Sequence, residues 1–168
     1  MKNKTEAIMN IRFLVPAFLA ILISACGQDE SSQHSSVVAK PQATAAAATL
    51  PRSTSPDGAR VFFITPATAD TVSSPVRIEF GIEGMNVVKA GDKQPHSGHH
   101  HLLIDTNLPN PGLPIPADEH HVHFGDGSTA TEISLAKGEH TLQLLLGNHL
   151  HVPHDPPVVS NPITITVE

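Results

Sequence analysis

The sequence predicts an all-β fold, an immunoglobulin-like antiparallel β-sandwich of about seven strands. Two observations lead to this prediction. From Arg60 onward, short runs rich in β-branched residues and leucine alternate with Pro, Gly, Asp and Asn turns, at the spacing typical of a sandwich. Several runs also alternate apolar and polar residues with a period of two, and none shows the 3.6-residue period of an amphipathic helix.

Seven runs are expected to form strands. In chain order they are RVFFIT (60–65), VRIEFGI (76–82), HHHLLIDT (99–106), HHVHFG (120–125), TEISL (131–135), HTLQLLLG (140–147) and ITITV (163–167). In the second run, Val76, Ile78 and Phe80 alternate with polar residues, which predicts one buried face and one face in water. The run from 140 to 147 alternates in the same way.

The first 25 residues are predicted to be a lipoprotein signal peptide. Three basic residues precede an apolar core at 13–23, which is too short to span a bilayer and suits a signal peptide. The core ends in Ile-Ser-Ala-Cys, which resembles a bacterial lipobox and predicts lipidation of Cys26. Gly27 follows instead of Asp, and in such lipoproteins this implies the outer membrane, with the domain on its periplasmic side. The membrane is therefore an expected partner, reached through Cys26.

The remaining chain divides into two parts. Residues 26–59 hold the lipidated Cys and a Ser-, Ala-, Thr- and Pro-rich stretch without apolar periodicity, which predicts a disordered tether. Residues 60–168 form the predicted β domain. The formal net charge of −6 argues against a nucleic-acid partner, because phosphate binding needs a basic surface. Cys26 is the single cysteine, so no disulfide is expected within the chain.

Histidines are the chemical signature of the domain: of the 12 in the chain, all but His34 lie between His96 and His154. Strand alternation places His99 and His101 together on the face opposite Leu102 and Ile104. The same His-x-His spacing recurs at 121/123 and at 149/151, with another histidine at 154. Three such pairs suggest a shared purpose.

Paired histidines of this kind predict a transition-metal site. Side chains at i and i+2 of a strand project side by side, and a pair on a neighbouring strand can complete four-coordinate binding. Imidazole suits Zn and Cu, and these are the expected cofactors. The predicted ligands are His99, His101, His121, His123, His151, His154 and Asp155.

Other interpretations of the histidines remain open. His100, His120 and His140 are in register with apolar residues and are expected to be packing residues. The His-x-His pairs could instead form a structural polar network, or respond to pH near the ordinary histidine pKa of 6.5. No nucleophile motif or His-Glu-x-x-His sequence is found, so no catalytic residue is predicted; metal-assisted catalysis is the third alternative.

Several long segments resemble the DUF4399 family. They are RVFFITP, GHHHLLID, PIPADEHHVHFGDG, HTLQLLLGNHLHVPHDPPVVS and ITITV, which together cover about 60–168. The resemblance implies a small secreted or periplasmic bacterial β domain of unknown function. Family positions match at His99, His100, His101, His120, His123, His140, His151, His154 and Asp155. The expected function is a lipid-anchored periplasmic binding module for Cu or Zn, with a non-enzymatic envelope interaction or structural domain as the alternative.

Overall fold

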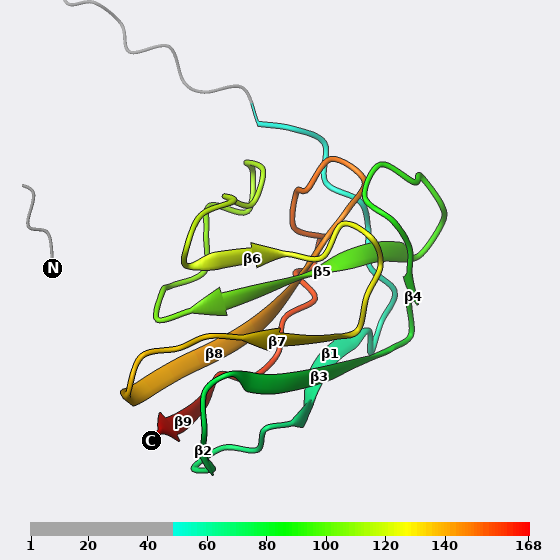
Figure 1. The fold of residues 1–168 in the computed structure, drawn as a ribbon. Coiled ribbons are helices and arrows are strands. Elements are labelled where there is room, and N and C mark those ends of the chain that lie inside the picture. Colours follow the sequence, from blue (N-terminus) through cyan, green and yellow to red (C-terminus); the bar gives the residue numbers. More distant parts are fainter. Residues whose placement is uncertain (1–48) are drawn as a thin grey trace, which may run out of the picture. The chain divides into compact units, whose positions relative to one another are not determined.

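Two β-sheets packed face to face make up residues 49–168, the part of the chain that the computed structural model describes (Figure 1). The predicted signal peptide, Cys26 and residues 26–48 of the predicted tether lie outside the described residues. The strands are β1 (Arg60–Thr65), β2 (Thr71–Val72), β3 (Val76–Glu83), β4 (Asn86–Val87), β5 (Ser97–Ile104), β6 (His121–His123), β7 (Ala130–Ile133), β8 (Gly138–Gly147) and β9 (Ile163–Val167). The described part of the chain holds no helix of the length and apolarity that a membrane crossing needs.

The all-β sandwich predicted from the sequence is confirmed. One sheet has the order β1-β3-β7, and the other has the order β2-β9-β8-β5-β4, with β6 also paired to β5. Each of the seven predicted runs contains a strand. The described residues add two strands of two residues each, β2 and β4, which pair in parallel with β9 and β5. All the longer pairings are antiparallel.

The main core lies between the two sheets and follows the period of two. From β3 it receives Val76, Ile78 and Phe80. From β5 it receives Leu102 and Ile104. The same face of β8 and the inner residues of β9 complete it with Leu142, Leu144, Leu146, Ile165 and Val167. Alternation therefore predicts correctly which residues face the partner sheet.

The outer face of the second sheet differs from the sequence expectation, because half of it is also buried. All eight residues of β5 are buried, on both faces. Leu103 and Leu145 form a second, smaller apolar cluster with Ile115 and Val159, which come from the loops before β6 and before β9. These loops cover the outer face of β5 and the end of β8. His99 and His101, which share this face, are therefore enclosed rather than in water.

The ordered domain begins before Arg60, where the sequence places the start of the fold. Residues 49–59 are described, and they contact the domain. The amide of Leu50 donates to the carbonyl of Gly112, and Thr54 forms a bridge with Asp155. The C-terminal end of the predicted tether is thus part of the folded unit, and its polar composition gave no sign of the hydrogen bonds that hold it.

His100 is a core residue, as predicted. Its ring meets Phe80 edge-on, with centroids 4.6 Å apart, and burial lowers the pKa of His100 to about 4. Neither ring nitrogen has a hydrogen-bond partner among the described residues. A neutral imidazole in this apolar surrounding fills space but leaves its polar atoms unpaired, which costs free energy.

Replacing His100 with leucine is therefore expected to stabilise the fold. His100→Leu removes two unpaired buried nitrogens and should raise the free energy of unfolding by about 1–3 kcal/mol at pH 7.5, measured by urea denaturation. His120→Leu is the matched control, because its half-exposed ring is bonded to the Ile104 carbonyl, and it should not stabilise. A destabilised His100→Leu variant would contradict the account of this residue.

Candidate metal centre

Four histidines meet on the outer face of β5. His99 and His101 come from β5 itself, and their common direction follows from the period of two. His123 lies on β6, directly opposite His101 in the antiparallel register. His151 comes from the turn after β8, and this turn returns beside His99 because β8 ends at Gly147, the partner of His99. Three elements that are distant in the sequence thus deliver one cluster, which we call the His quartet.

The four rings of the His quartet are mutual neighbours. Ring centroids are 4.8 Å apart for 99/101, 4.9 Å for 99/123 and 4.8 Å for 99/151. The remaining separations are 5.0 Å for 101/123, 6.0 Å for 101/151 and 4.8 Å for 123/151. Four imidazoles bound tetrahedrally at the usual Zn–N distance would have centroids about 5 Å apart, close to these values.

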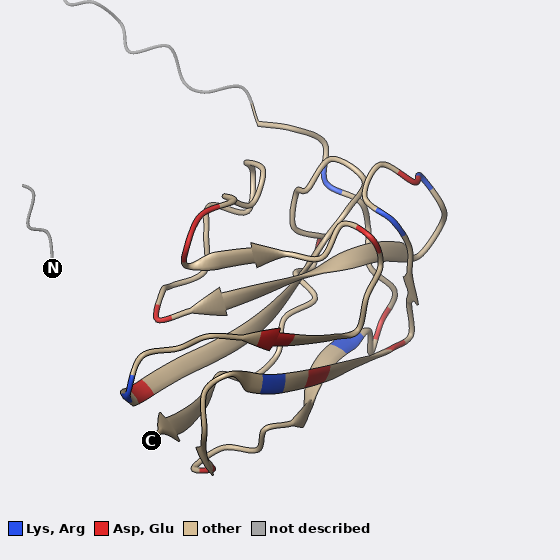
Figure 2. Cartoon of the chain, viewed as in Figure 1, with Lys and Arg blue, Asp and Glu red and all other residues tan. Residues whose placement is uncertain are grey.

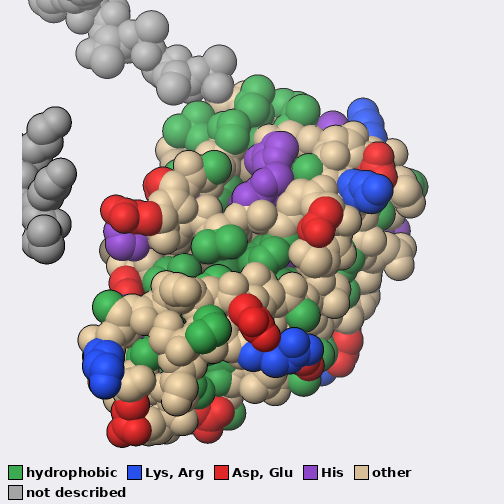
Figure 3. All heavy atoms as spheres, in the orientation of Figure 1, with side chains coloured by type: hydrophobic (Ala, Val, Ile, Leu, Met, Phe, Trp, Pro, Cys, Tyr) green, Lys and Arg blue, Asp and Glu red, His purple; other side chains and the backbone are tan. Residues whose placement is uncertain are grey.

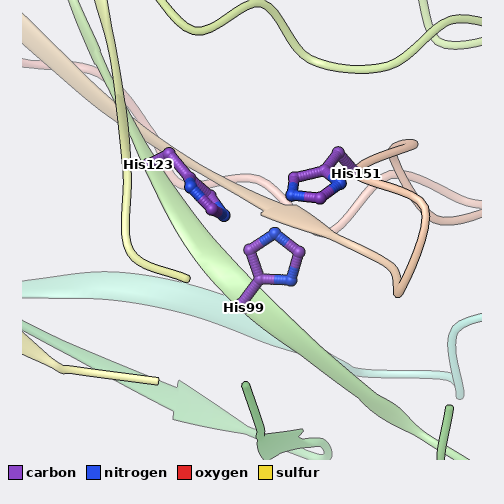
Figure 4. A group of neighbouring side chains, drawn as sticks. All are labelled: His99, His123 and His151. Carbon is purple, nitrogen blue, oxygen red and sulfur yellow. The ribbon is translucent and has the colours of Figure 1, made fainter. Parts of the chain in front are cut away.

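Ligand atoms of three of the four rings also converge. One nitrogen from each of His99, His123 and His151 lies within 4.8 Å of the others, and each of these rings directs a nitrogen toward the space between them (Figure 4). Nitrogens bound to one metal ion stand closer, at roughly 3.3 Å for Zn–N bonds of about 2.0 Å. Each nitrogen would have to move by about 1 Å toward the common centre to reach this separation.

Burial lowers the pKa of three histidines of the quartet and keeps the two inner ones neutral. Burial first, and then the neighbouring charges of His151 and His123, lower the pKa of His99 to about 3. Burial, followed by His99 and His123, lowers the pKa of His101 to about 2. Burial and His151 also lower the pKa of His123, against the opposing charge of Asp126. Neutral imidazole is the form that binds a metal.

Unpaired nitrogens mark the two inner histidines. Both ring nitrogens of His99 lack a hydrogen-bond partner within residues 49–168, and so does the Nδ1 of His101. Buried polar atoms are paired in nearly all native structures, and an unpaired one calls for an explanation such as an ion. The donor set of the quartet also fits a transition-metal ion, because imidazole nitrogens are suitable ligands for Zn or Cu.

Glycines make room for the quartet, and sequence reasoning missed them. A Cβ on Gly147 would stand 2.7 Å from Cε1 of His101 and 3.3 Å from Cδ1 of Ile115. A Cβ on Gly125 would collide with the ring of His123. Both glycines end histidine-bearing strand runs and look like ordinary strand ends, so only the three-dimensional structure shows that they are needed beside these rings.

Three of the predicted ligands are engaged elsewhere. The Nδ1 of His121 lies 2.7 Å from a carboxylate oxygen of Asp118. The ring nitrogens of His154 lie 3.3 Å from the Leu146 carbonyl oxygen and 3.1 Å from that of Ser97. Asp155 forms an ion pair with Arg52. The structure therefore brings together the rings of His99, His101, His123 and His151. Ligand nitrogens of three of them, His99, His123 and His151, lie within 4.8 Å of one another.

The predicted pairing of His149 with His151 needs correction. A shared direction at i and i+2 holds for a strand, but β8 ends at Gly147 and these residues lie in a turn. His151 has a φ of 63°, in the left-handed region, which breaks the alternation. His149 instead lines a separate groove together with His96.

The other two predicted packing histidines differ from each other. His120 is half-exposed and hydrogen-bonds the Ile104 carbonyl, so it is not a core residue. The side chain of His140 is largely buried, with Nδ1 2.7 Å from Asp105 and Nε2 3.0 Å from the Ala136 carbonyl oxygen. Both stand at the starts of strand runs, where alternation alone does not tell a packing residue from one that secures the strand end.

Comparison with known families adds one match. A family model described as "Domain of unknown function (DUF4399)" matches residues 78–168, which is more than half of the chain. The matched range contains all four histidines of the quartet. No curated protein and no solved structure shows a significant match to the chain.

The contact between His140 and Asp105 predicts a pH-dependent contribution to stability. The hydrogen bond to Asp105, partly opposed by burial, raises the pKa of His140, and both ring N–H groups of the cation find acceptors. Because the pKa is higher in the folded state, the stabilisation is complete below the pKa of the unfolded state, which is near 6.5. It is lost as the pH rises through the pKa of the folded state.

We therefore expect His140→Gln to reduce the free energy of unfolding more at pH 5.5 than at pH 8, by about 0.5–1 kcal/mol for a solvent-accessible pair. Urea denaturation of wild type and variant at both pH values measures this difference. The other histidines contribute equally to both proteins, so their contributions cancel. Asp105→Asn should show the same pH trend. Equal losses at the two pH values would exclude a charged His140.

Proposed function

The chain belongs to the DUF4399 family, whose description assigns no function, and we propose from the site itself that this member is a binding module for one transition-metal ion, Cu or Zn. The ligands are His99, His101, His123 and His151. The proposed role is to take up or buffer the ion, and it includes no catalytic step. Lipidated Cys26 would anchor the module to the outer membrane, on the periplasmic side.

The convergence of four imidazoles, two of which are fully buried and carry unpaired nitrogens, carries this proposal. A structural network, the alternative from the sequence, would hold its rings through hydrogen bonds. His99 has no such bond at either nitrogen, and His101 has none at Nδ1, within the described residues. Gathering uncharged rings without pairing their nitrogens is costly for stability alone. A bound ion would satisfy the same atoms.

The electrostatic surroundings support a cation held by neutral ligands. Neither β5 nor β6 carries a Lys, Arg, Asp or Glu, and the charged residues lie on the three-stranded sheet, on the loops and, as Glu139, at the start of β8 (Figure 2). Asp126 is the acidic residue whose charge acts on the pKa of His123. Its carboxylate receives hydrogen bonds from Ser128 and could balance part of the charge of an ion from outside the ligand set.

Access for the ion is on the side of β6 and the turn. His123 is exposed and His151 is half-buried, whereas His99 and His101 are closed off by the protein. Figure 3 shows histidine side chains at the surface, bordered by apolar ones. An ion arriving from solvent would meet the two outer imidazoles first and then the two inner ones, an order suited to uptake by a binding module.

Metal titration tests the proposal. The full-length chain, purified in detergent and stripped of metal, should bind one equivalent of Cu(II) or Zn(II) at pH 7.5 in calorimetry, more tightly than about 10 μM. His99→Ala combined with His101→Ala removes half of the ligand set and should weaken binding by about 100-fold or more.

The matched control is His96→Asn, an exposed histidine outside the quartet that stands in the left-handed region, where asparagine is tolerated. Its affinity should equal that of the wild type. Absence of binding in the wild type, or equal loss in the control and the double variant, would refute a metal role for the quartet.

A further inference from the structure

We propose that Arg52 is a positioning residue of the metal centre and that residues 50–56, which we call the N-terminal strap, hold the turn that carries His151. This inference rests on the proposed function and adds to it a segment that lies before the matched family range. The strap follows the predicted lipid anchor, Cys26, in the sequence. The proposal therefore puts this N-terminal segment in direct contact with the turn that supports one ligand.

The turn that carries His151 lies beyond the end of β8, so the hydrogen bonds of the strand do not stabilise it. β8 ends at Gly147, and a bridge from Gly147 to Pro153 closes the neck of the turn. His151 adopts a φ of 63°, a conformation that costs free energy for a residue with a side chain and persists where the surroundings fix it. Its carbonyl accepts a hydrogen bond from the Ile115 amide. The other supports come from within the turn and from the strap.

Asn148 forms the centre of the turn and links it to the strap. Its side-chain oxygen accepts hydrogen bonds from the amides of Leu150 at 2.8 Å and Val152 at 3.1 Å, on both sides of His151. Its side-chain nitrogen donates to the hydroxyl of Ser53 at 3.2 Å. Asn148 is buried, so these bonds are shielded from water and fix the amide orientation. The strap thus orients the group that shapes the turn.

Arg52 holds the far side of the same turn. Its Nε donates to the Pro153 carbonyl at 3.1 Å, and one terminal nitrogen donates to the carbonyl of His154. The other terminal nitrogen lies 3.1 Å from the carboxylate of Asp155. The planar guanidinium satisfies three successive residues in this way, which the single nitrogen of a lysine cannot do. The residues just after His151 are therefore fixed by a side chain distant in the sequence.

Backbone pairing completes the strap. The amide of Asp155 donates to the Ser53 carbonyl at 2.9 Å, and the amide of Ser55 donates to the Asp155 carbonyl at 3.1 Å. The hydroxyl of Ser55 donates to the Pro156 carbonyl at 2.8 Å. Both ends of the turn are held, Asn148 at one end and residues 153–156 at the other. Loss of these contacts would free His151, while His99, His101 and His123 stay in the sheet.

The test compares Arg52→Gln with Arg60→Gln in the full-length chain. Arg60 forms an exposed pair with Glu83 on the other sheet, so it is the matched control. In metal-free protein, Arg52→Gln should speed amide hydrogen exchange at His151 and Val152, and leave β3 unchanged. With Cu(II) or Zn(II), it should weaken binding by about 10-fold, the loss typical of an outer-shell partner. Arg60→Gln should change neither.

A double-variant cycle with His151→Ala separates positioning from general damage. Once His151 is absent, Arg52→Gln should no longer affect metal affinity, because the ligand that it positions is missing. Arg52→Lys should behave like Arg52→Gln, since it cannot form the three contacts. An equal affinity loss with and without His151, or unchanged exchange in the turn, would overturn the inference. If the wild type binds no metal, the proposed function fails, and exchange in the turn still decides whether the strap holds it.

Discussion

The burial of histidine on the outer face of β5 is the constraint on which the rest of the site depends. Because strand residues alternate, placing Leu102 in the core places His99 and His101 together on the opposite face. Loops then cover that face, and the imidazoles lose water without gaining partners. Each unpaired nitrogen costs about 1–3 kcal/mol, so the metal-free fold carries a cost that binding of an ion to the folded state would offset.

Adjacent histidines of β5 lie in different surroundings. His100 meets Phe80 and the apolar core, and no second histidine approaches it among the ring contacts of the described residues. His99 and His101 meet two further imidazoles within 6.0 Å. Residue type alone does not bring a histidine into the cluster; the cross-strand partner does. In β5 the strand register supplies that partner, because His101 stands opposite His123.

Local patterns in the sequence predicted what depends on local physics. The seven strand runs, the core face of β3 and the opposed directions of His100 and His101 follow from the period of two. The covering of the outer face did not follow, because it depends on loops far away in the chain. His121 shares the spacing of His123 yet turns to Asp118, and His151 joins the quartet through a left-handed turn. Such outcomes depend on hydrogen bonds between distant segments, which composition and spacing do not show.

The four proposed ligands differ in how firmly the fold holds them, and this difference bears on the proposed uptake of an ion. His99 and His101 stand on a strand paired on both sides, and His123 on a short strand paired with it, so the sheet fixes three imidazoles. His151 depends on a turn held by side chains, among them Asn148 and Arg52. A preformed set of three sheet ligands reduces the ordering that binding requires. One proposed ligand on a separately held turn would give an ion a way in and out without opening the sandwich, and this suits the proposed uptake role better than a permanent structural site.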